Sequence, residues 1–328
     1  MAISMKNGSS SSRIRAIEGR IRTLQYALAV LAAAVVVLAI YSLYPSIASA
    51  FKPQPLSFGH TLAGIDTQFS SQQLSVINSA PNSYFEIAGE RLLNGTLTDE
   101  VLPQNSPQFS PIIINGKPSV IYIGAISCIF CGENRWSMAL ALSRFGNFSR
   151  LYVGYSSFGD GDIPTVYWNY NNYSSDGVTY GSYYNSRYIN FYPSEYDSNI
   201  TQGFQVQPLP YFIQRAPNST YAKVLTFMNS TNGFQGTPFT FWGTSLNRGA
   251  DAVVLGNTTP TSSSFPLTNM THQQVLNQLQ NFSDQFAWGE YAGADVYIAE
   301  VCPSINNAAP VCSLPAIKQI GAIMGLSS

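Results

Sequence analysis

Blocks of apolar residues at two different spacings predict helices first and strands afterwards in the N-terminal half of the chain. The segments DTQFSSQQLSVINS and PNSYFEIAGERLLNG have helical spacing, and the second ends at Asn94-Gly95, a typical helix stop. Two apolar strands follow on either side of Asn115-Gly116, which indicates a hairpin or another tight connection. The second strand, at about 119–126, is largely apolar, which is typical of a central strand covered on both faces.

A pair of cysteines directly follows this central strand. Cys128 and Cys131 precede the segment GENRWSMALALSRFG, in which Trp136 and Leu140 fall on one helical stripe and Gly146 can end the helix. The segment LYVGYSS then predicts another strand. The order strand, Cys-X-X-Cys, helix, strand predicts a βαβ unit with the cysteines at the start of its helix.

Residues 157–222 interrupt this pattern because they are dense in Gly, Asn, Ser and Tyr. We interpret them as a long insertion with short strands or ordered loops, whose tyrosines form either packed loops or a surface for a substrate or glycan. Regular signals return in FTFWG and ADAVVLG, which predict an antiparallel pair. The segment THQQVLNQLQNFSDQFAW predicts a helix with Thr268 or Thr271 as its N-cap, and SLPAIKQIGAIMG predicts a final apolar helix.

A long apolar run near the N-terminus predicts a membrane anchor. Ala27 to Tyr44 read ALAVLAAAVVVLAIYSLY, and no charged residue lies between Arg22 and Lys52. Such a run is long enough to cross a hydrocarbon layer of about 30 Å as a helix. The basic residues before it predict that the first residues stay in the cytoplasm and that the rest lies outside the cell. The alternative is a signal peptide that is cleaved near Ala50, which leaves a secreted protein.

These patterns divide the chain into four parts. We expect a cytoplasmic tail (1–23), a transmembrane anchor (24–49), a linker with N-terminal helices (50–109), and an α/β domain (110–328). Within the α/β domain we place the insertion at about 157–222 and a helical C-terminal segment that is closed by a disulfide. Cys302 and Cys312 would form this disulfide across a short proline-containing loop, and a relay of electrons to the first cysteine pair is the alternative role.

Composition excludes several classes of function. Charged residues make up 10% of the chain, against roughly 25% in ordinary soluble proteins, and the net charge is −1. No basic face is therefore expected, and nucleic acid is excluded as a partner. The chain has 2 histidines, His60 and His272, which nearly exclude histidine-rich metal chemistry and which we expect at the surface. We expect neither a metal nor a dissociable cofactor.

Glycosylation signals agree with a location outside the cytoplasm. The acceptor pattern Asn-X-Ser/Thr recurs after the predicted anchor more often than chance explains. The candidate acceptors are Asn94, Asn147, Asn172, Asn199, Asn218, Asn229, Asn257, Asn269 and Asn281.

The first cysteine pair has three possible roles. At a helix start, Cys128 would be exposed and stabilised as a thiolate, so it would attack a disulfide, and Cys131 would resolve the mixed disulfide. The pair could instead be an inert structural disulfide, or half of a zinc site completed by the two C-terminal cysteines. Glu133 either tunes the dithiol or is a first-turn acid that the helix dipole favours.

A second motif connects this pair to a known superfamily. The segment GFQGTPFTFWG places Thr237 and Pro238 at the start of a strand more than a hundred residues after the cysteines. With Cys128 and Cys131, it resembles the extracytoplasmic disulfide oxidoreductases of the thioredoxin-like superfamily. The resemblance implies that Pro238 is cis and faces the cysteines, and that the Thr237 backbone binds an extended substrate strand. A fully buried Cys128, or a trans and distant Pro238, would argue against an enzyme.

A narrower resemblance covers the anchor, the Tyr/Asn/Ser-rich composition and the segment ISCIFCGENRWSMALALSRFGNF. These features are similar to an archaeal family from Sulfolobus relatives that is catalogued as a domain of unknown function (number 929). Two features depart from the wider superfamily: Ser127 precedes the first cysteine where an aromatic residue is common, and no acidic residue in SVIYIGAI is placed to accept the proton of Cys131.

The sequence thus predicts an α/β, thioredoxin-like fold with a long insertion and an N-terminal transmembrane helix. The expected function is thiol–disulfide exchange on exported proteins, with their thiols or disulfides as partners. The sequence does not identify a redox partner. The alternative is a non-catalytic, glycosylated protein of the cell envelope that uses the same fold as a binding or structural scaffold.

Overall fold

The computed structural model describes residues 67–95, 111–126, 128–156, 162–169, 178–196, 209–231, 237–242, 246–247, 267–282 and 284–326. All of them lie in the unit of residues 55–328. The predicted cytoplasmic tail and membrane anchor lie outside the described residues. None of the helices in these ranges is long and apolar enough to span a bilayer.

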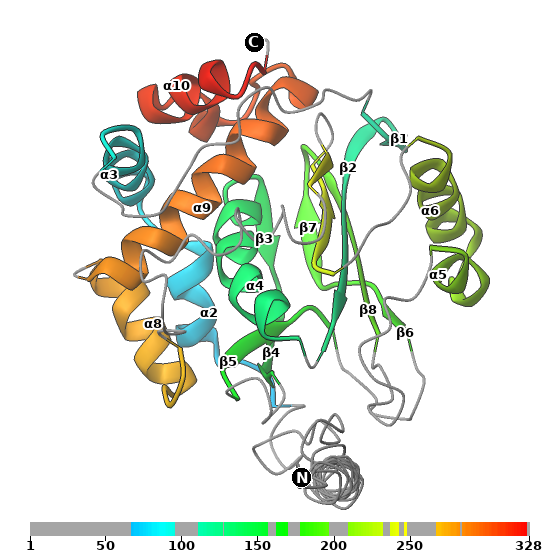
Figure 1. Ribbon diagram of the computed structural model, residues 1–328, viewed down its shortest axis with the longest axis horizontal. Coiled ribbons are helices and arrows are strands. Elements are labelled where there is room, and N and C mark those ends of the chain that lie inside the picture. Colours follow the sequence, from blue (N-terminus) through cyan, green and yellow to red (C-terminus); the bar gives the residue numbers. More distant parts are fainter. Residues whose placement is uncertain are drawn as a thin grey trace, which may run out of the picture. The chain divides into compact units, whose positions relative to one another are not determined.

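The described chain begins and ends with helices and has its strands between them, and Figure 1 labels most of these elements. The elements before the centre of the chain are α2 (Ser71–Asn78), α3 (Asn82–Leu93), β1 (Ile113–Ile114), β2 (Lys117–Ala125), α4 (Ile129–Leu142), β3 (Gly146–Phe148), β4 (Tyr152–Tyr155) and β5 (Pro164–Tyr167). Those after it are β6 (Val178–Tyr180), β7 (Tyr184–Ser186), β8 (Asn190–Tyr196), α5 (Leu209–Arg215), α6 (Ser219–Thr231), β9 (Phe239–Phe241), β10 (Leu246–Asn247), α8 (His272–Asn281), α9 (Gln285–Val301), η3 (Cys302–Ile305), η4 (Pro310–Ser313) and α10 (Pro315–Ile323).

A six-stranded mixed sheet is built around β2. Its strand order is β10–β9–β2–β8–β6, and β1 pairs with β2 as a hairpin. β8 runs parallel to β2, whereas β9 pairs antiparallel with β2 and β10 antiparallel with β9. The hairpin turn is confirmed, because Asn115 and Gly116 both have positive φ angles, which a tight two-residue turn requires.

The predicted βαβ unit exists, but its second strand is not the predicted one. LYVGYSS supplies β4, which pairs antiparallel with β5 in a separate two-stranded sheet. The parallel neighbour of β2 is β8, which lies within residues 157–222, the segment that we interpreted as an insertion. Its sequence, NFYPSEY, has the same tyrosine-rich composition as its surroundings, so composition alone hid a strand of the central sheet.

Helix boundaries follow the predicted caps in most places. α3 lies between Pro81 and Asn94, and Thr271 caps α8 with a reciprocal capping box. The long C-terminal helix is in fact two helices, because α8 ends at Asn281 and α9 begins after its own cap, Asp284. Gly146 does not end α4, since it opens strand β3 and the helix already ends at Leu142.

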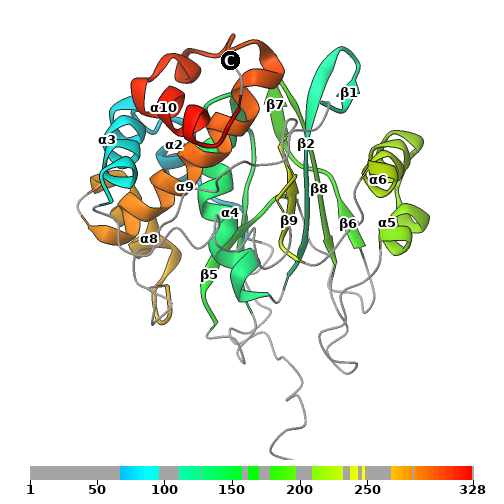
Figure 2. The same cartoon turned by 45° about the horizontal axis from the view of Figure 1, so that its top comes forward.

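Two apolar cores lie on opposite faces of the sheet. Figures 1 and 2 show α2, α3, α4, α8, α9 and α10 on one face and α5 and α6 on the other. Successive side chains of β2 enter the two cores in turn: Val120 and Tyr122 join the larger core, whereas Ile121 and Ile123 join the smaller one. The prediction of a strand covered on both faces is confirmed. Helix α4 is itself buried along its length, except at Phe130.

Candidate dithiol site

Cys128 is the residue that begins helix α4. Its backbone is extended, and its Sγ accepts a hydrogen bond from the Cys131 backbone N–H at 3.4 Å, so the sulfur is the N-cap of the helix. The Cys128 N–H donates to the Ala125 carbonyl at 3.2 Å, which joins the end of β2 to the helix in a tight turn. The pair therefore stands at the helix start, as predicted, where N–H groups and the helix dipole favour a thiolate.

Both cysteines of the pair are free thiols, and both are buried. Cys128 keeps 3% of its surface exposed and Cys131 keeps none. The expectation of an exposed Cys128 is wrong for this conformation, because both side chains pack in the smaller core with Phe212 and Phe239. Phe130, between the two cysteines, is the exposed residue of the motif, at 39%.

The two thiols have different electrostatic surroundings. The hydrogen bond to the Cys131 sulfur, together with burial, raises the pKa of Cys128 well above its ordinary value. Burial also acts to raise the pKa of Cys131, but the hydrogen bond from Cys128 and the nearby Arg135 guanidinium outweigh it and lower that pKa. The expected stabilisation of a Cys128 thiolate is therefore wrong for this conformation, since the hydrogen bond that the pair shares raises the pKa of Cys128 and lowers that of Cys131.

The second motif lies beside the cysteine turn. β9 pairs with β2 so that Phe239 is opposite Ile123, and Thr237 and Pro238 directly precede Phe239 in the chain. Phe239 packs in the same core as Cys128 and Cys131. The Thr237–Pro238 peptide bond is cis, as the resemblance implied. Thr237 is half-buried and Pro238 is buried.

Three buried residues next to the pair were missed by the sequence reasoning. Arg135, one helical turn after Cys131, forms a bidentate ion pair with Glu195 of β8, and both N···O distances are 2.7 Å. Tyr122 of β2 lies with its ring centre 5.9 Å from the guanidinium carbon. The spacing of four residues from Cys131 to Arg135 was a readable signal, but Glu195 was hidden in the segment interpreted as an insertion.

Glu133 takes part in a different cluster from the thiols. It is 1% exposed, and neither of its carboxyl oxygens has a hydrogen-bond partner within the described ranges. Burial raises the pKa of Glu133 to about 8. Its neighbour is Glu290 of α9, whose Oε2 accepts a hydrogen bond from Ser137 Oγ at 2.5 Å and whose pKa is raised by burial and then by the charge of Glu133.

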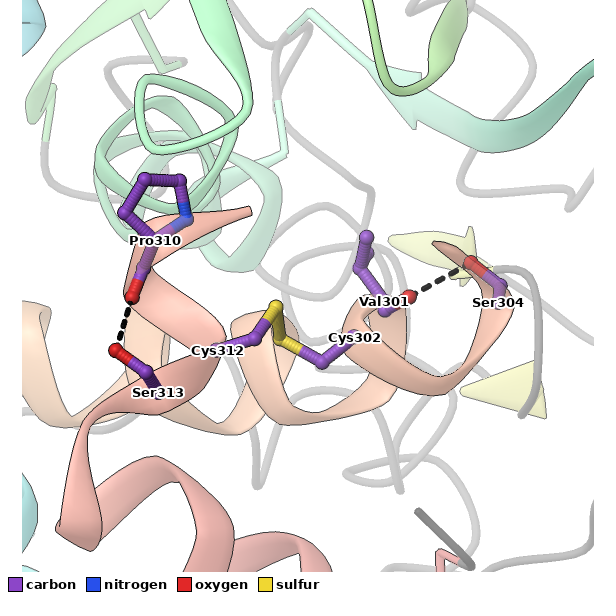
Figure 3. Close-up of a disulfide and its surroundings, with 6 residues drawn as sticks. All are labelled: Val301, Cys302, Ser304, Pro310, Cys312 and Ser313. Carbon is purple, nitrogen blue, oxygen red and sulfur yellow. Dashed lines mark hydrogen bonds between the residues drawn. A yellow bond between two sulfur atoms is a disulfide. The ribbon is translucent and has the colours of Figure 1, made fainter. Parts of the chain in front are cut away.

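Cys302 and Cys312 form the predicted disulfide. Their Cα atoms are 5.6 Å apart, and the bond links η3 to η4, as Figure 3 shows. A serine hydroxyl group in each short helix donates a hydrogen bond to a carbonyl three residues earlier, Ser304 to Val301 and Ser313 to Pro310. Both cysteines line a cavity of about 480 Å³.

Other predicted positions have mixed outcomes. His272 is buried rather than at the surface, because the start of α8 packs on β4 and β5, where its Nε2 lies 2.7 Å from the Thr165 carbonyl and 2.8 Å from that of Gly154. His60 lies outside the described residues. In the part of the chain that the structure describes, no group of three His, Cys, Asp or Glu side chains could hold a metal ion.

Five of the candidate glycosylation sites have exposed asparagines, at Asn94, Asn147, Asn218, Asn269 and Asn281. Asn229 belongs to α6, but its side chain is not described, and Asn172, Asn199 and Asn257 lie outside the described residues. Glycosylation at these positions stays a prediction.

Fold and site together define a mixed α/β protein with a dithiol at the start of a buried central helix. The family model described as a domain of unknown function (DUF929) matches residues 105–302, and the chain belongs to this family, as the sequence indicated. The matched residues include both thiols and the Thr237–Pro238 segment. Neither a curated protein nor a solved structure matches the chain.

The buried carboxyl group of Glu133 predicts a fold that is more stable in acid. Its pKa is about 8 in the folded state, against about 4.3 in an unfolded chain, so the folded state holds the proton more tightly. The stabilisation is complete below about pH 4 and is lost as the pH rises towards 8. We expect the free energy of unfolding, measured by urea denaturation, to fall by roughly 2–4 kcal/mol across this range.

Glu133→Gln removes the titrating group and keeps its shape. This variant should be less sensitive to pH than the unmodified protein and more stable than it at pH 8. Glu90→Gln, at an exposed position of α3, is the matched control and should leave the pH dependence unchanged. Equal slopes in the Glu133→Gln variant and the unmodified protein would refute the assignment.

The disulfide predicts a second measurable contribution to stability. Replacing both Cys302 and Cys312 by alanine opens a loop of about ten residues, which should lower the free energy of unfolding by roughly 2–3 kcal/mol. Guanidinium denaturation without reductant measures this loss. Adding reductant to the unmodified protein should reproduce it. A variant as stable as the unmodified protein would show that the bridge adds no stability.

Proposed function

We propose that this protein is a thioredoxin-like thiol–disulfide oxidoreductase that acts on exported proteins. The observation that carries the proposal is that two segments far apart in the sequence pack together near the end of the central strand β2. Thr237 and Pro238 directly precede β9, whose first residue Phe239 pairs with β2 and packs with both cysteines, and Cys128 caps the helix that follows β2. A dithiol at a helix start beside the beginning of an antiparallel strand is the arrangement that exchange enzymes of this superfamily use.

The order of the strands supports the same assignment of fold. β2, α4 and β8 form a parallel βαβ unit, and β9 and β10 follow as an antiparallel pair on the other side of β2. Helices α5 and α6 lie between these two halves in the sequence, and α8 and α9 follow the last strand. This order supports a thioredoxin-like assignment, in which the β4–β5 and β3–β7 pairs are additions.

The proposed reaction needs no cofactor. In the reducing direction, the Cys128 sulfur attacks one sulfur of a substrate disulfide and passes its proton to Cys131, and the other substrate sulfur leaves as a thiolate. The Cys131 thiol then gives its proton to solvent and its sulfur attacks Cys128, which breaks the mixed disulfide and releases the second substrate thiolate. The substrate gains two electrons, and the pair becomes a disulfide.

The ligand that best fits this site is an extended segment of a substrate protein. Thr237 is half-buried two residues before β9, and its partial exposure supports a role in which its backbone pairs with an added strand. The exposed ring of Phe130, between the two cysteines, would contact an apolar side chain beside the substrate disulfide. Such segments occur in incompletely folded proteins, which fits a protein anchored by residues 24–49 with its dithiol domain outside the cell.

The burial of Cys128 favours one other candidate function. With 3% of its surface exposed, Cys128 reaches a substrate only after a local movement of the apolar side chains around it. A glycosylated envelope protein that uses this fold as a binding scaffold would need no such movement. The two functions differ in whether the thiols react with a protein disulfide.

An exchange assay distinguishes these functions. The domain after the predicted anchor is tested for insulin reduction with dithiothreitol as the electron source, and for refolding of scrambled ribonuclease. We expect Cys128→Ser to abolish both activities while keeping α4 intact, because serine is itself a good N-cap. Unchanged activity in Cys128→Ser would sink the mechanism, and no activity in the unmodified domain would favour the scaffold.

The second cysteine provides an independent readout. Cys131→Ser leaves Cys128 able to attack and unable to be released, so it should accumulate a mixed disulfide with the substrate, visible by non-reducing electrophoresis. The double variant Cys128→Ser, Cys131→Ser is the matched control and should trap nothing. Equal trapping by the double variant would assign the adduct to another residue.

A further inference from the structure

Arg135 has an unusual position among the basic residues of this protein. It is the only arginine or lysine of the described ranges that is buried, and it has no exposed surface. Nε and Nη2 bind Glu195, and Nη2 also donates to the Ala125 carbonyl at 2.9 Å. The same carbonyl accepts the Cys128 backbone N–H, so the guanidinium and the cysteine turn share one acceptor.

One part of the guanidinium is left unsatisfied. Nη1 is buried and has no hydrogen-bond partner within the described part of the chain. A buried donor without an acceptor lowers the stability of the fold, so such a group needs an explanation. The dithiol can supply the negative charge, because Cys131 lies one helical turn before Arg135 and feels its charge, and a thiolate in this apolar core would otherwise be unstable.

Ion-pair geometry also explains why the charge is available to the thiols. Glu195 holds the guanidinium by its Nε–Nη2 edge and fixes its plane, which is the bidentate mode that arginine favours. The carboxylate offsets part of the positive charge, which is why both groups tolerate burial. The Arg135 charge still lowers the pKa of both Cys131 and Cys128, and its effect outweighs that of Glu195 on Cys131.

We propose that Arg135 is the counter-charge that stabilises the Cys131 thiolate during disulfide exchange. This role rests on the proposed function. The sequence offered no acidic residue to accept the proton of Cys131, and a nearby positive charge favours loss of that proton in another way. Arg135 accepts no proton. It favours the state in which Cys131 has already released its proton to solvent, so that the sulfur can attack Cys128 in the mixed disulfide and expel the substrate sulfur as a thiolate.

A titration of the single thiol tests this role without any substrate. In a Cys128→Ser background Cys131 is the remaining free cysteine, and because it is fully buried its ionisation is followed by the ultraviolet absorbance of its thiolate from pH 5 to pH 10. We expect Arg135→Met to move the midpoint of this profile upwards by at least about one pH unit. Arg135→Lys, which keeps the charge but loses the planar fork, should move it less.

A second variant covers the case in which Arg135→Met does not fold because Glu195 is left unpaired. Arg135→Met with Glu195→Leu replaces the ion pair by apolar side chains, which buried pairs commonly tolerate. It should shift the midpoint in the same direction, by a smaller amount. Arg144→Met, a partly buried arginine that binds the Ala80 and Asn78 carbonyls, is the matched control and should not shift it.

The outcomes separate this role from the proposed function. An unchanged midpoint in a folded double variant, with native circular dichroism, would overturn the role of Arg135. A shifted midpoint in a protein that reduces no disulfide would support the electrostatic assignment and leave the exchange function unsupported.

Discussion

The burial of β2 on both faces is the constraint on which the rest of the structure depends. A strand covered on two sides must be apolar throughout, and its alternate side chains then join two separate cores. Its neighbours are fixed by the same strand, with β8 parallel on one side and β9 antiparallel on the other. Because the chain leaves β2 directly into the Cys128 turn, the packing of one strand places the thiols, the start of β9 and the Arg135–Glu195 pair together.

The sequence could predict the parts of the fold whose signals are local. Asn115-Gly116, the helix α3 with its flanking Pro81, and the apolar strand β2 have strong short-range patterns, and they form as expected. β8 could not be predicted in this way. Its burial comes from its neighbours in the sheet, and its sequence carries polar and tyrosine residues like those of the surrounding loops.

The residues of the candidate site also differ in how far the sequence could predict them. The cysteine pair and Thr237-Pro238 were readable as motifs because their chemistry depends on residue type and spacing. The burial of Cys128 depends on which segments pack over the helix start, and these come from distant parts of the chain. The ion-pair partner of Arg135, Glu195, lies 60 positions after it. Glu133 was assigned to the wrong surroundings for a similar reason, since the helix that covers it is α9, more than 150 residues later.

Helix α4 buries ionisable side chains in two different ways, with Arg135 paired and Glu133 protonated. Arg135 is neutralised by a carboxylate with good geometry, so its charge persists inside the protein. Glu133 and Glu290 have no such cation among the described contacts, and the raised pKa values mean that they keep their protons. Among the described residues, both kinds of burial occur on α4, the helix that carries the dithiol.

The use of a sulfur atom as the cap of α4 has an evolutionary consequence. Oxygen-bearing side chains cap helices as well as sulfur does or better, and a cysteine codon becomes a serine codon by one base change. A descendant of this protein could therefore lose the reactive thiol and keep the helix, the sheet and the surface of the domain. An enzyme and a binding scaffold would then be separated by one atom, which makes Cys128 the position at which members of the family should first be compared.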